Sequence, residues 1–280
     1  MNKTHNKSWL ITGASAGLGR LMAERLLARG DRVVAMMRRT EALDDLARAH
    51  GDRLAVVKLD LADPRRVRGV VDDAFAKTGR IDVVVSNAGY GLFGAAEEVT
   101  DDQIDRQIAV NLTGSIQLIR AALPHLRAQG GGRVVQVSSE GGQTTYPNFS
   151  LYHATKWGIE GFVEAAAQEV APFGIDFILV EPGATATDFG AGLVHAAPLA
   201  VYDDTPAGAV RRMVTEGSFP IKGDAQRTVA AMIAAADAPR PALRLTLGSI
   251  AYESISRVLA ARLAALQAQR EVAVSADRDG

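Results

Sequence analysis

Short apolar runs that end in glycine or small polar residues alternate along the chain with segments of helical periodicity. The first run, residues 9–12, stops at a glycine, which is typical of a buried strand. Six further strands are expected at 32–37, 54–59, 81–85, 133–137, 175–181 and 243–248, the last at an edge of the sheet. Because strands that alternate with helices pair in parallel, the pattern predicts an α/β fold. We expect a doubly wound, mostly parallel sheet of about seven strands with helices on both faces.

Segments of helical pattern fill the intervals between these strands. One over 20–29 ends at Gly30, and Asp63 followed by Pro64 indicates the start of another. Further helices are expected from Thr100 onwards, over about 150–170 and over 224–236. A last helix over about 251–268 has apolar residues at helical spacing, which include Ile255, Val258, Leu259, Leu263 and Leu266.

The segment from about 184 to 221 shows no clean periodicity. Its larger side chains are Phe189, Leu193, His195, Leu199, Tyr202 and Phe219. A long irregular stretch inside a compact domain is usually a functional lid or a disordered segment. Neither a repeat nor a linker divides the chain, so we expect one domain over 1–280 with a frayed tail at 272–280. His195 has no companion ligands at metal-binding spacing, and we predict no metal site.

Composition narrows the possible functions. The chain has 280 residues, of which 48% are hydrophobic, so it can bury a large core. A formal net charge of −1 gives no electrostatic case for binding nucleic acid or an anionic membrane. The absence of cysteine excludes disulfides, thiol catalysis and thiolate metal sites. Polar first residues and no long apolar segment argue against a signal peptide and a membrane span, and a cytoplasmic protein is expected.

A glycine-rich turn follows the first strand and precedes the first helix. Its residues are Gly13, Ala14, Ser15, Ala16, Gly17, Leu18 and Gly19. Glycine lets the backbone approach a pyrophosphate, and a helix amino terminus offers unpaired N–H groups with a partial positive charge. The spacing G-x-x-x-G-x-G is not the commonest dinucleotide fingerprint. The order of strand, turn and helix nevertheless predicts a dinucleotide phosphate site.

The end of the second strand indicates which dinucleotide binds. An acidic residue commonly stands roughly 20 residues beyond the glycines and contacts the adenosine ribose. Here Arg38 and Arg39 follow two methionines and there is no carboxylate. An acid would repel a 2′-phosphate, whereas a guanidinium pairs with it through two hydrogen bonds. The sequence therefore favours NADP(H), with NAD(H) as the alternative. Asp60 and Leu61 end the third strand, where contact with the adenine is expected.

Tyr152 and Lys156 lie four residues apart at the start of a predicted helix. At this spacing the two side chains share one face. The ammonium favours the phenolate, so we expect it to lower the pKa of Tyr152 from roughly 10 towards neutrality. A tyrosine tuned in this way exchanges a proton with a carbonyl or alcohol oxygen. Such pairs also occur by chance on solvated helices, so the rest of the chain decides.

Seven motifs occur in one order over residues 9–187. They are Thr12-Gly13-Ala14-x-x-x-Gly17-x-Gly19, Asp60, Asn87-Ala88-Gly89, Asn111, Ser139, Tyr152-x-x-x-Lys156 and Pro182-Gly183. Through these motifs the chain resembles the short-chain dehydrogenase/reductase family, in its single-domain branch. Ser86 is a small departure, because the family often has a second asparagine there. The resemblance implies a Rossmann-type fold and an oxidoreductase. Such an enzyme transfers a hydride between a nicotinamide and a carbonyl or secondary alcohol of a small molecule.

The resemblance also implies four catalytic residues. Tyr152 would be the general acid in carbonyl reduction and the base in alcohol oxidation. Lys156 would bind the nicotinamide ribose and depress the pKa of Tyr152. Ser139 would hydrogen-bond the substrate oxygen, and Asn111 would hold a water that links Lys156 to solvent. Neighbours of the catalytic residues vary in the family, so His153 is given no role.

The implied cofactor contacts are spread over four strand ends. Gly13, Gly17 and Gly19 would shape the pyrophosphate site, Asp60 would lie at the adenine, Asn87 would line the cofactor groove and Thr187 would reach the nicotinamide carboxamide. Further cofactor contacts are expected at Ser15, Leu18, Leu61, Ala88, Gly89, Pro182, Gly183 and Thr185. The family's region corresponding to 184–221 covers the substrate, which suggests a lid with an apolar lining and a fairly apolar substrate. The resemblance further suggests a homodimer or homotetramer, with the helices that follow Asn111 and Tyr152 at the interface.

Two other readings of the nucleotide site remain open. One is an isomerase, epimerase or dehydratase, although such relatives usually carry a larger carboxyl-terminal substrate domain, which this chain lacks. The other is a redox-sensing or regulatory nucleotide-binding protein. Proteins of that kind often lose the tyrosine or the lysine, and both are present here.

Overall fold

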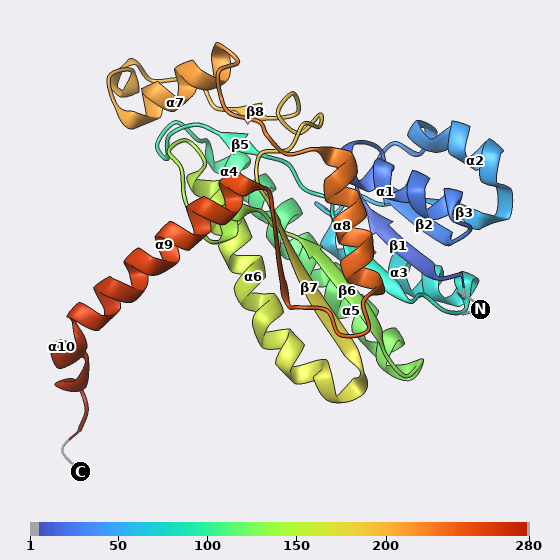
Figure 1. Ribbon diagram of the computed structural model, residues 1–280. Helices are drawn as coiled ribbons and strands as arrows, with labels where there is room; N and C mark the ends of the chain where they lie inside the picture. The colour runs from blue at the N-terminus through green and yellow to red at the C-terminus, as the bar shows by residue number, and fades with distance from the viewer. Residues whose placement is uncertain (1–5, 279–280) are drawn as a thin grey trace.

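The alternation of strands and helices builds one seven-stranded sheet in the computed structural model, which describes residues 6–278 (Figure 1). Its strands are β1 (Ser8–Thr12), β2 (Arg32–Met37), β3 (Leu54–Lys58), β4 (Val83–Ser86), β6 (Gly132–Val137), β7 (Ile175–Pro182) and β9 (Arg244–Leu247). They lie in the order β3-β2-β1-β4-β6-β7-β9, and every neighbouring pair is parallel. The predicted doubly wound sheet is confirmed, including the edge position of the last strand.

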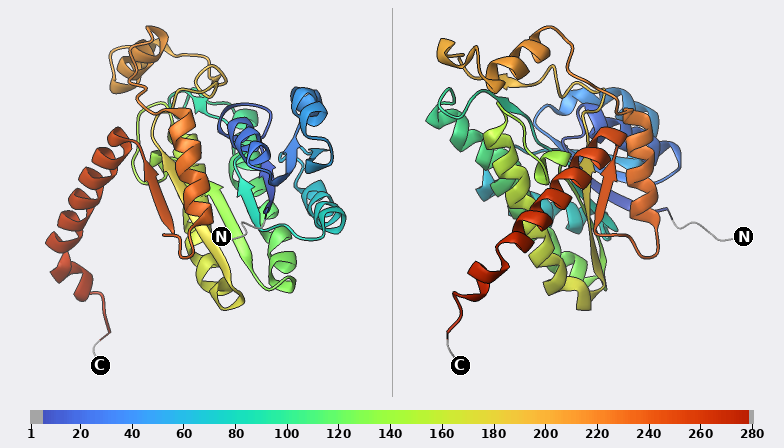
Figure 2. Two further views of the ribbon diagram at one scale, coloured as in Figure 1. Left: turned by 45° about the vertical axis from the view of Figure 1, so that its right-hand side comes forward. Right: turned by 60° about the vertical axis from the view of Figure 1, so that its left-hand side comes forward.

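Helices cover both faces of this sheet (Figure 2). On one face lie α3 (Pro64–Thr78), α5 (Ser115–Ala128) and α6 (Ser150–Val170), and on the other α1 (Gly17–Ala28) and α8 (Ala225–Asp237), while α2 (Asp44–His50) connects β2 to β3. Successive residues of a strand point to opposite faces. Leu10 accordingly packs in the core under α3 and α5, whereas Trp9 and Ile11 pack under α1 and α8.

The helix expected from Thr100 begins with a capping box. The Thr100 hydroxyl accepts the N–H of Gln103, and the Gln103 side chain accepts the N–H of Thr100. This helix, α4 (Asp101–Ile108), runs through a π-helical turn (Ala109–Gly114) into α5. Turns of this kind are rare and frequently mark functional sites. The sequence did not predict it.

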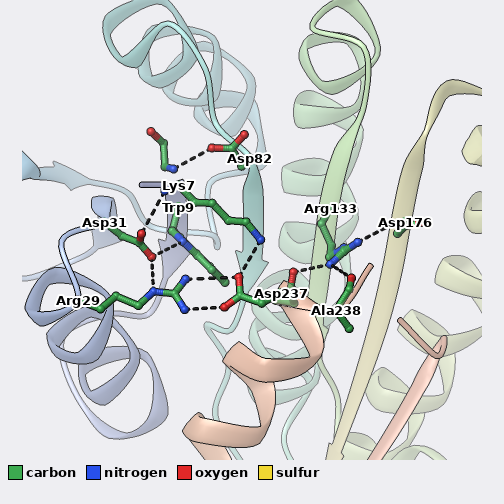
Figure 3. Close-up of polar contacts among 11 residues, drawn as sticks. Lys7, Trp9, Arg29, Asp31, Asp82, Arg133, Asp176, Asp237 and Ala238 are labelled. Atoms are coloured by element: carbon green, nitrogen blue, oxygen red, sulfur yellow. Dashed lines mark hydrogen bonds and ion pairs between the residues drawn. The ribbon is translucent and has the colours of Figure 1, made fainter. Parts of the chain in front are cut away.

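Charged side chains connect the amino ends of the strands to helices α1 and α8 (Figure 3). Asp31, which is buried, accepts hydrogen bonds from the Lys7 backbone at 3.1 Å, the Trp9 indole at 3.0 Å and the Arg29 guanidinium at 2.6 Å. Asp237, at the end of α8, pairs with Arg29 at 2.5 Å and with Lys7 at 2.7 Å. We call Lys7, Trp9, Arg29, Asp31 and Asp237 the amino-edge cluster. Each of its charges has a partner within the cluster.

Residues 184–221 lie above the carboxyl ends of the strands (Figure 1). They contain β8 (Val194–His195) and α7 (Pro206–Thr215). β8 pairs in parallel with β5 (Leu92–Phe93), which follows β4. The sequence predicted none of these three elements. For β5 and β8 the reason is that two residues are too few to show a hydrophobic period.

Two polar side chains from outside this segment attach it to the domain. Glu98, which is buried, accepts the N–H of Leu199 at 2.8 Å and pairs with Arg211 of α7 at 2.5 Å. Asn148 donates a hydrogen bond to the Ala207 carbonyl at 2.7 Å. Asn148 has φ +67°, a left-handed conformation that asparagine tolerates better than most residues. The irregular segment is therefore fixed at both β8 and α7.

The long carboxyl-terminal helix α9 (Ser249–Ala268) projects away from the sheet and is followed by α10 (Arg270–Val274) (Figure 1). Ile255 near its start is buried, whereas Leu259, Leu263 and Leu266 are 48%, 56% and 61% exposed. The tail predicted to fray begins in α10, and its residues 279 and 280 lie outside the described part. Among residues 6–278, no helix combines the length and apolar character needed to cross a bilayer.

Candidate active site

A cavity of about 850 Å³ opens at the carboxyl edge of the sheet, where the strand order reverses between β1 and β4. Ligands of doubly wound folds bind in this crevice. The predicted site residues in its wall are Gly13, Ser15, Gly17, Leu18, Arg38, Arg39, Asp60, Leu61, Asn87, Ala88, Gly89, Ser139, Tyr152, Lys156, Pro182, Gly183, Thr185 and Thr187. Two predicted site residues, Gly19 and Asn111, lie outside the wall.

The glycine turn is held by hydrogen bonds from the end of β4. The Thr12 hydroxyl accepts the N–H groups of Asn87 at 3.0 Å and Ala88 at 3.1 Å, and the Asn87 amide donates to the Thr12 carbonyl at 3.0 Å. Gly13 has φ +68°, and a Cβ there would lie 2.8 Å from Cα of Ala88. A Cβ on Gly19 would lie 2.4 Å from the Gly13 carbonyl oxygen. The absence of side chains at Gly13 and Gly19 thus permits the tight turn and leaves its backbone open to a ligand.

Arginines surround the end of the cavity near β2. Arg38 and Arg39 are exposed there, and neither takes part in a salt bridge within residues 6–278. Arg106 of α4 lines the same cavity. Burial raises the pKa of the neighbouring Tyr90, and the positive charges of Arg106 and Arg38 oppose that rise. Sequence reasoning missed Arg106, because only the fold brings its helix to this edge.

Two turns, one on each side of the cavity, involve predicted cofactor residues. The Asp60 carboxylate accepts the N–H of Ala62 at 2.9 Å, which fixes the turn after β3. The Thr185 hydroxyl donates to the Gly183 carbonyl at 2.8 Å after β7. A Cβ on Gly17 would lie 3.7 Å from Cβ of Thr187, so the start of the irregular segment lies beside the glycine turn.

Tyr152 and Lys156 come together with Ser139 at the start of α6. Both α6 residues are buried. The Lys156 ammonium donates to the Val137 carbonyl at 3.0 Å and lies 5.5 Å from the centre of the Tyr152 ring. Ser139 follows β6, and its hydroxyl accepts the N–H of Gly141 at 3.1 Å. A phenol, a hydroxyl and an ammonium therefore meet in one buried corner of the cavity.

The direction of the Tyr152 pKa differs from the prediction. Burial raises this pKa to about 12, hydrogen bonding with Ser139 lowers it, and the negative charge of Glu140 raises it. Burial also lowers the pKa of Lys156 to about 8, against the influence of Glu160. The prediction was wrong for the protein alone, because loss of solvent outweighs an ammonium that lies over the ring. A further positive charge in the cavity is needed to stabilise the phenolate.

Asn111 lies in the π-helical turn and is buried. Its amide oxygen accepts the N–H of Tyr90 at 3.1 Å, and its amide nitrogen donates to the Tyr90 carbonyl at 2.8 Å. The side chain thus fixes the chain after β4.

Aromatic side chains line the part of the cavity beyond Tyr152. Phe189 of the irregular segment has its ring centroid 5.8 Å from that of Tyr152, and Phe149 lies at 6.0 Å. Tyr146 and His153 also line this part. Sequence reasoning missed Tyr146 and Phe149 and gave His153 no role. Their place in the sequence could have indicated this, because all three lie between Ser139 and Lys156, which were both predicted to line the site.

No cluster of three or more metal-ligating side chains occurs in residues 6–278. His195 is exposed on β8, where its ring lies 5.3 Å from that of Phe93.

Comparisons with known proteins agree with this geometry. The family model described as "short chain dehydrogenase" matches residues 7–197. The chain is 34% identical over 270 residues to "Oxidoreductase BOA17" of Botryotinia fuckeliana, and the match covers 96% of this chain and 98% of that protein.

Two solved structures have the same fold. A short-chain dehydrogenase from Streptomyces avermitilis is 40% identical with a TM-score of 0.90, and the match covers 99% of this chain and 100% of that one. A Burkholderia cenocepacia short-chain dehydrogenase in complex with NADP is 26% identical with a TM-score of 0.73, and the coverage is 95% and 97%. The chain belongs to the short-chain dehydrogenase/reductase family of oxidoreductases.

Proposed function

We propose that the protein is an NADP(H)-preferring oxidoreductase that interconverts a carbonyl and a secondary alcohol of a fairly apolar small molecule. The observation that carries this proposal is that one cavity contains both the glycine turn and the Tyr152, Ser139 and Lys156 group. The glycine turn would hold the pyrophosphate of a dinucleotide, and Tyr152 and Lys156 would contact its nicotinamide end in the same cavity. When bound, its nicotinamide supplies or accepts the hydride.

The residues of the chain position the substrate and move the proton. In reduction, the Tyr152 hydroxyl donates its proton to the carbonyl oxygen, and in oxidation the phenolate takes the proton back. The Ser139 hydroxyl donates a hydrogen bond to the same oxygen and stabilises the charge that develops there. The Lys156 ammonium lies 5.5 Å from the centre of the Tyr152 ring, and its positive charge favours the phenolate.

The arginines at the end of β2 support the NADP(H) preference. A 2′-phosphate carries negative charge, and Arg38 and Arg39 present guanidinium groups with no competing carboxylate partner among the described residues. Arg106 adds a third positive charge to the cavity wall. The Burkholderia cenocepacia relative in complex with NADP is consistent with this reading.

The aromatic and aliphatic lining supports an apolar substrate. Tyr146, Phe149 and Phe189 surround the approach to Tyr152, and Leu193, Val214, Phe219 and Ile221 continue the lining. Residues 184–221 supply five of these seven side chains by their position, so we assign this segment the role of the substrate lid. The cytoplasmic location and the homodimer or homotetramer stay predictions. Sedimentation equilibrium tests the latter.

The first experiment is oxidation of NADPH and of NADH against a panel of aldehydes, ketones, steroids and β-ketoacyl thioesters. We expect turnover of a few related apolar carbonyls, faster with NADPH. Binding of NADPH is followed in parallel by its fluorescence. Tight NADPH binding without turnover of any carbonyl would contradict the reductase reading and favour a regulatory nucleotide-binding protein.

A further inference from the structure

His153 is hydrogen-bonded to two residues of the loop 139–149, which connects β6 to α6. The side chain is 4% exposed, and Tyr152 precedes it on α6. Its Nε2 accepts the backbone N–H of Tyr146 at 2.8 Å, and its Nδ1 lies 2.9 Å from the Gly141 carbonyl oxygen. A backbone N–H can only donate, so Nε2 carries no proton and the neutral ring bears its proton on Nδ1. Nδ1–H therefore donates to Gly141. Burial lowers the pKa of His153, against these two hydrogen bonds, which agrees with a neutral ring.

The two ends of this loop contribute different parts of the site. Ser139 stands at its start, and Gly141 donates its N–H to the Ser139 hydroxyl. At its end, Tyr146 and Phe149 form the aromatic wall of the cavity, with ring centroids 5.6 Å and 6.2 Å from that of His153. The hydrogen bond to Gly141 thus acts on the Ser139 end, and the one from Tyr146 acts on the wall.

The fit between this loop and α6 is close. A Cβ on Gly141 would lie 2.7 Å from Nδ1 of His153. Two turns further along the same helix face, Glu160 accepts hydrogen bonds from the Ser138 hydroxyl at 2.5 Å and from Gln143 at 2.6 Å. Because Glu160 holds the base of the loop independently, loss of His153 is expected to shift the loop locally without unfolding it.

We propose that His153 is a positioning residue with two separable tasks: its Nδ1–H orients the Ser139 hydroxyl through Gly141, and its Nε2 sets the aromatic wall through Tyr146. The first task belongs to the chemical step and the second to substrate selection. The kinetic part of this inference rests on the proposed carbonyl chemistry.

Two amide substitutions separate the tasks. The nitrogen of Asn reaches about the position of Nδ1, and the oxygen of Gln about that of Nε2. His153→Asn keeps a donor for Gly141 and should raise KM about tenfold with kcat within about twofold. His153→Gln keeps an acceptor for Tyr146 and should lower kcat about tenfold with KM within about twofold. The carbonyl probe is the best substrate from the panel.

The matched control is His125→Gln. His125 is partly buried on α5, pairs with Asp72 at 2.6 Å and stacks on Phe75, away from the cavity. We expect it to change neither kinetic constant. A purely structural histidine would lower thermal stability and leave the two amide variants with the same kinetic pattern, and that result would overturn the proposal.

A readout without substrate keeps the inference testable if no carbonyl is turned over. Amide hydrogen exchange of the Tyr146 N–H should accelerate about tenfold in His153→Asn and stay near the wild-type rate in His153→Gln. Equal exchange in both variants and the wild type would overturn the role of Nε2. Absence of turnover in the wild type would contradict the proposed function alone.

Discussion

The two ends of the same sheet are built in opposite ways. At the amino ends of the strands, the charges of the amino-edge cluster pair with one another, and buried Asp31 receives three hydrogen bonds. At the carboxyl ends, the guanidinium groups of Arg38 and Arg39 and the Tyr152 corner face a cavity. Polar groups that satisfy each other stabilise the fold, whereas groups left for a ligand give up some of that stability. The comparison separates residues that hold the sheet from residues that act on a substrate.

Tyr152→Phe should give the largest effect, and it tests whether residues at the carboxyl ends of the strands serve activity and not stability. Removing the proton donor should lower kcat by about 10³-fold, within the range of general acid catalysis. NADPH affinity and the melting temperature should stay close to wild type, because the lost hydroxyl belongs to the cavity. The measurements are steady-state kinetics, fluorescence titration and calorimetry. Activity within tenfold of wild type would contradict the assigned role.

Asp31→Ala tests the opposite end. The change leaves the Trp9 indole and one face of Arg29 without their buried acceptor, which should destabilise the fold by about 3 kcal/mol. Turnover per folded molecule should not change, because no cluster residue lines the cavity. Denaturant unfolding and active-site titration measure the two quantities. As a matched control, Asp45→Ala removes an exposed carboxylate that pairs with Arg20 and should leave the free energy of unfolding nearly unchanged, because solvent screens an exposed ion pair.

Arg38→Asp asks whether the free charge at the carboxyl edge selects the cofactor. An acid there repels the 2′-phosphate and accepts hydrogen bonds from a ribose. We expect kcat/KM for NADPH to fall by at least about tenfold relative to NADH, or about 1.4 kcal/mol. Arg53→Asp is the control, since Arg53 bonds to the Leu27 carbonyl and lies outside the cavity wall. Unchanged selectivity would assign the 2′-phosphate to Arg39 or Arg106 instead.

A fall in pH should give the smallest effect, which is a loss of folding stability. It acts through Glu98 near the carboxyl ends of the strands and through Asp237 at the amino ends. The pKa values of Glu98 and Asp237 both lie below the ordinary carboxyl value. Burial raises each pKa, but hydrogen bonds and positively charged partners lower it by more. The unfolded chain therefore binds more protons, so the stabilisation is present above about pH 4 and is lost as pH falls through the lower folded-state values.

Melting curves between about pH 6 and pH 3 follow this loss. Glu98→Gln should flatten the profile slightly and mainly raise KM, because Glu98 attaches residues 184–221, part of which lines the cavity, through Leu199 and Arg211. A wild-type profile without a decline on the acid side would contradict the contribution of both carboxylates.

The carboxyl edge was largely predictable from the sequence and the irregular segment was not. Strands of four or more residues show their apolar pattern, and the glycine turn is a local feature, so both were placed within two residues. β4 illustrates the error, because it begins at Val83 whereas the prediction began at residue 81. Pro64 at the first turn of α3 also acted as predicted.

The features that escaped prediction depend on contacts distant in sequence. Glu98 and Arg211 meet only after residues 184–221 have folded against β5, and Arg106 reaches the cavity only through the packing of α4. The Tyr152 pKa was misjudged because the spacing of Tyr and Lys reports their shared face but not how deeply they are buried. His153 carries no motif at all.

Because every pair of neighbouring strands is parallel, the sheet is completed late during synthesis on the ribosome. Parallel neighbours need a crossover, and Trp9 of β1 waits for Val83 of β4 before its second side is paired. β7 is complete at Pro182, but its outer neighbour β9 starts only at Arg244. Over that interval the nascent chain presents an open edge of buried-type strand to other chains. Aggregation during expression should therefore respond to translation speed across residues 183–247.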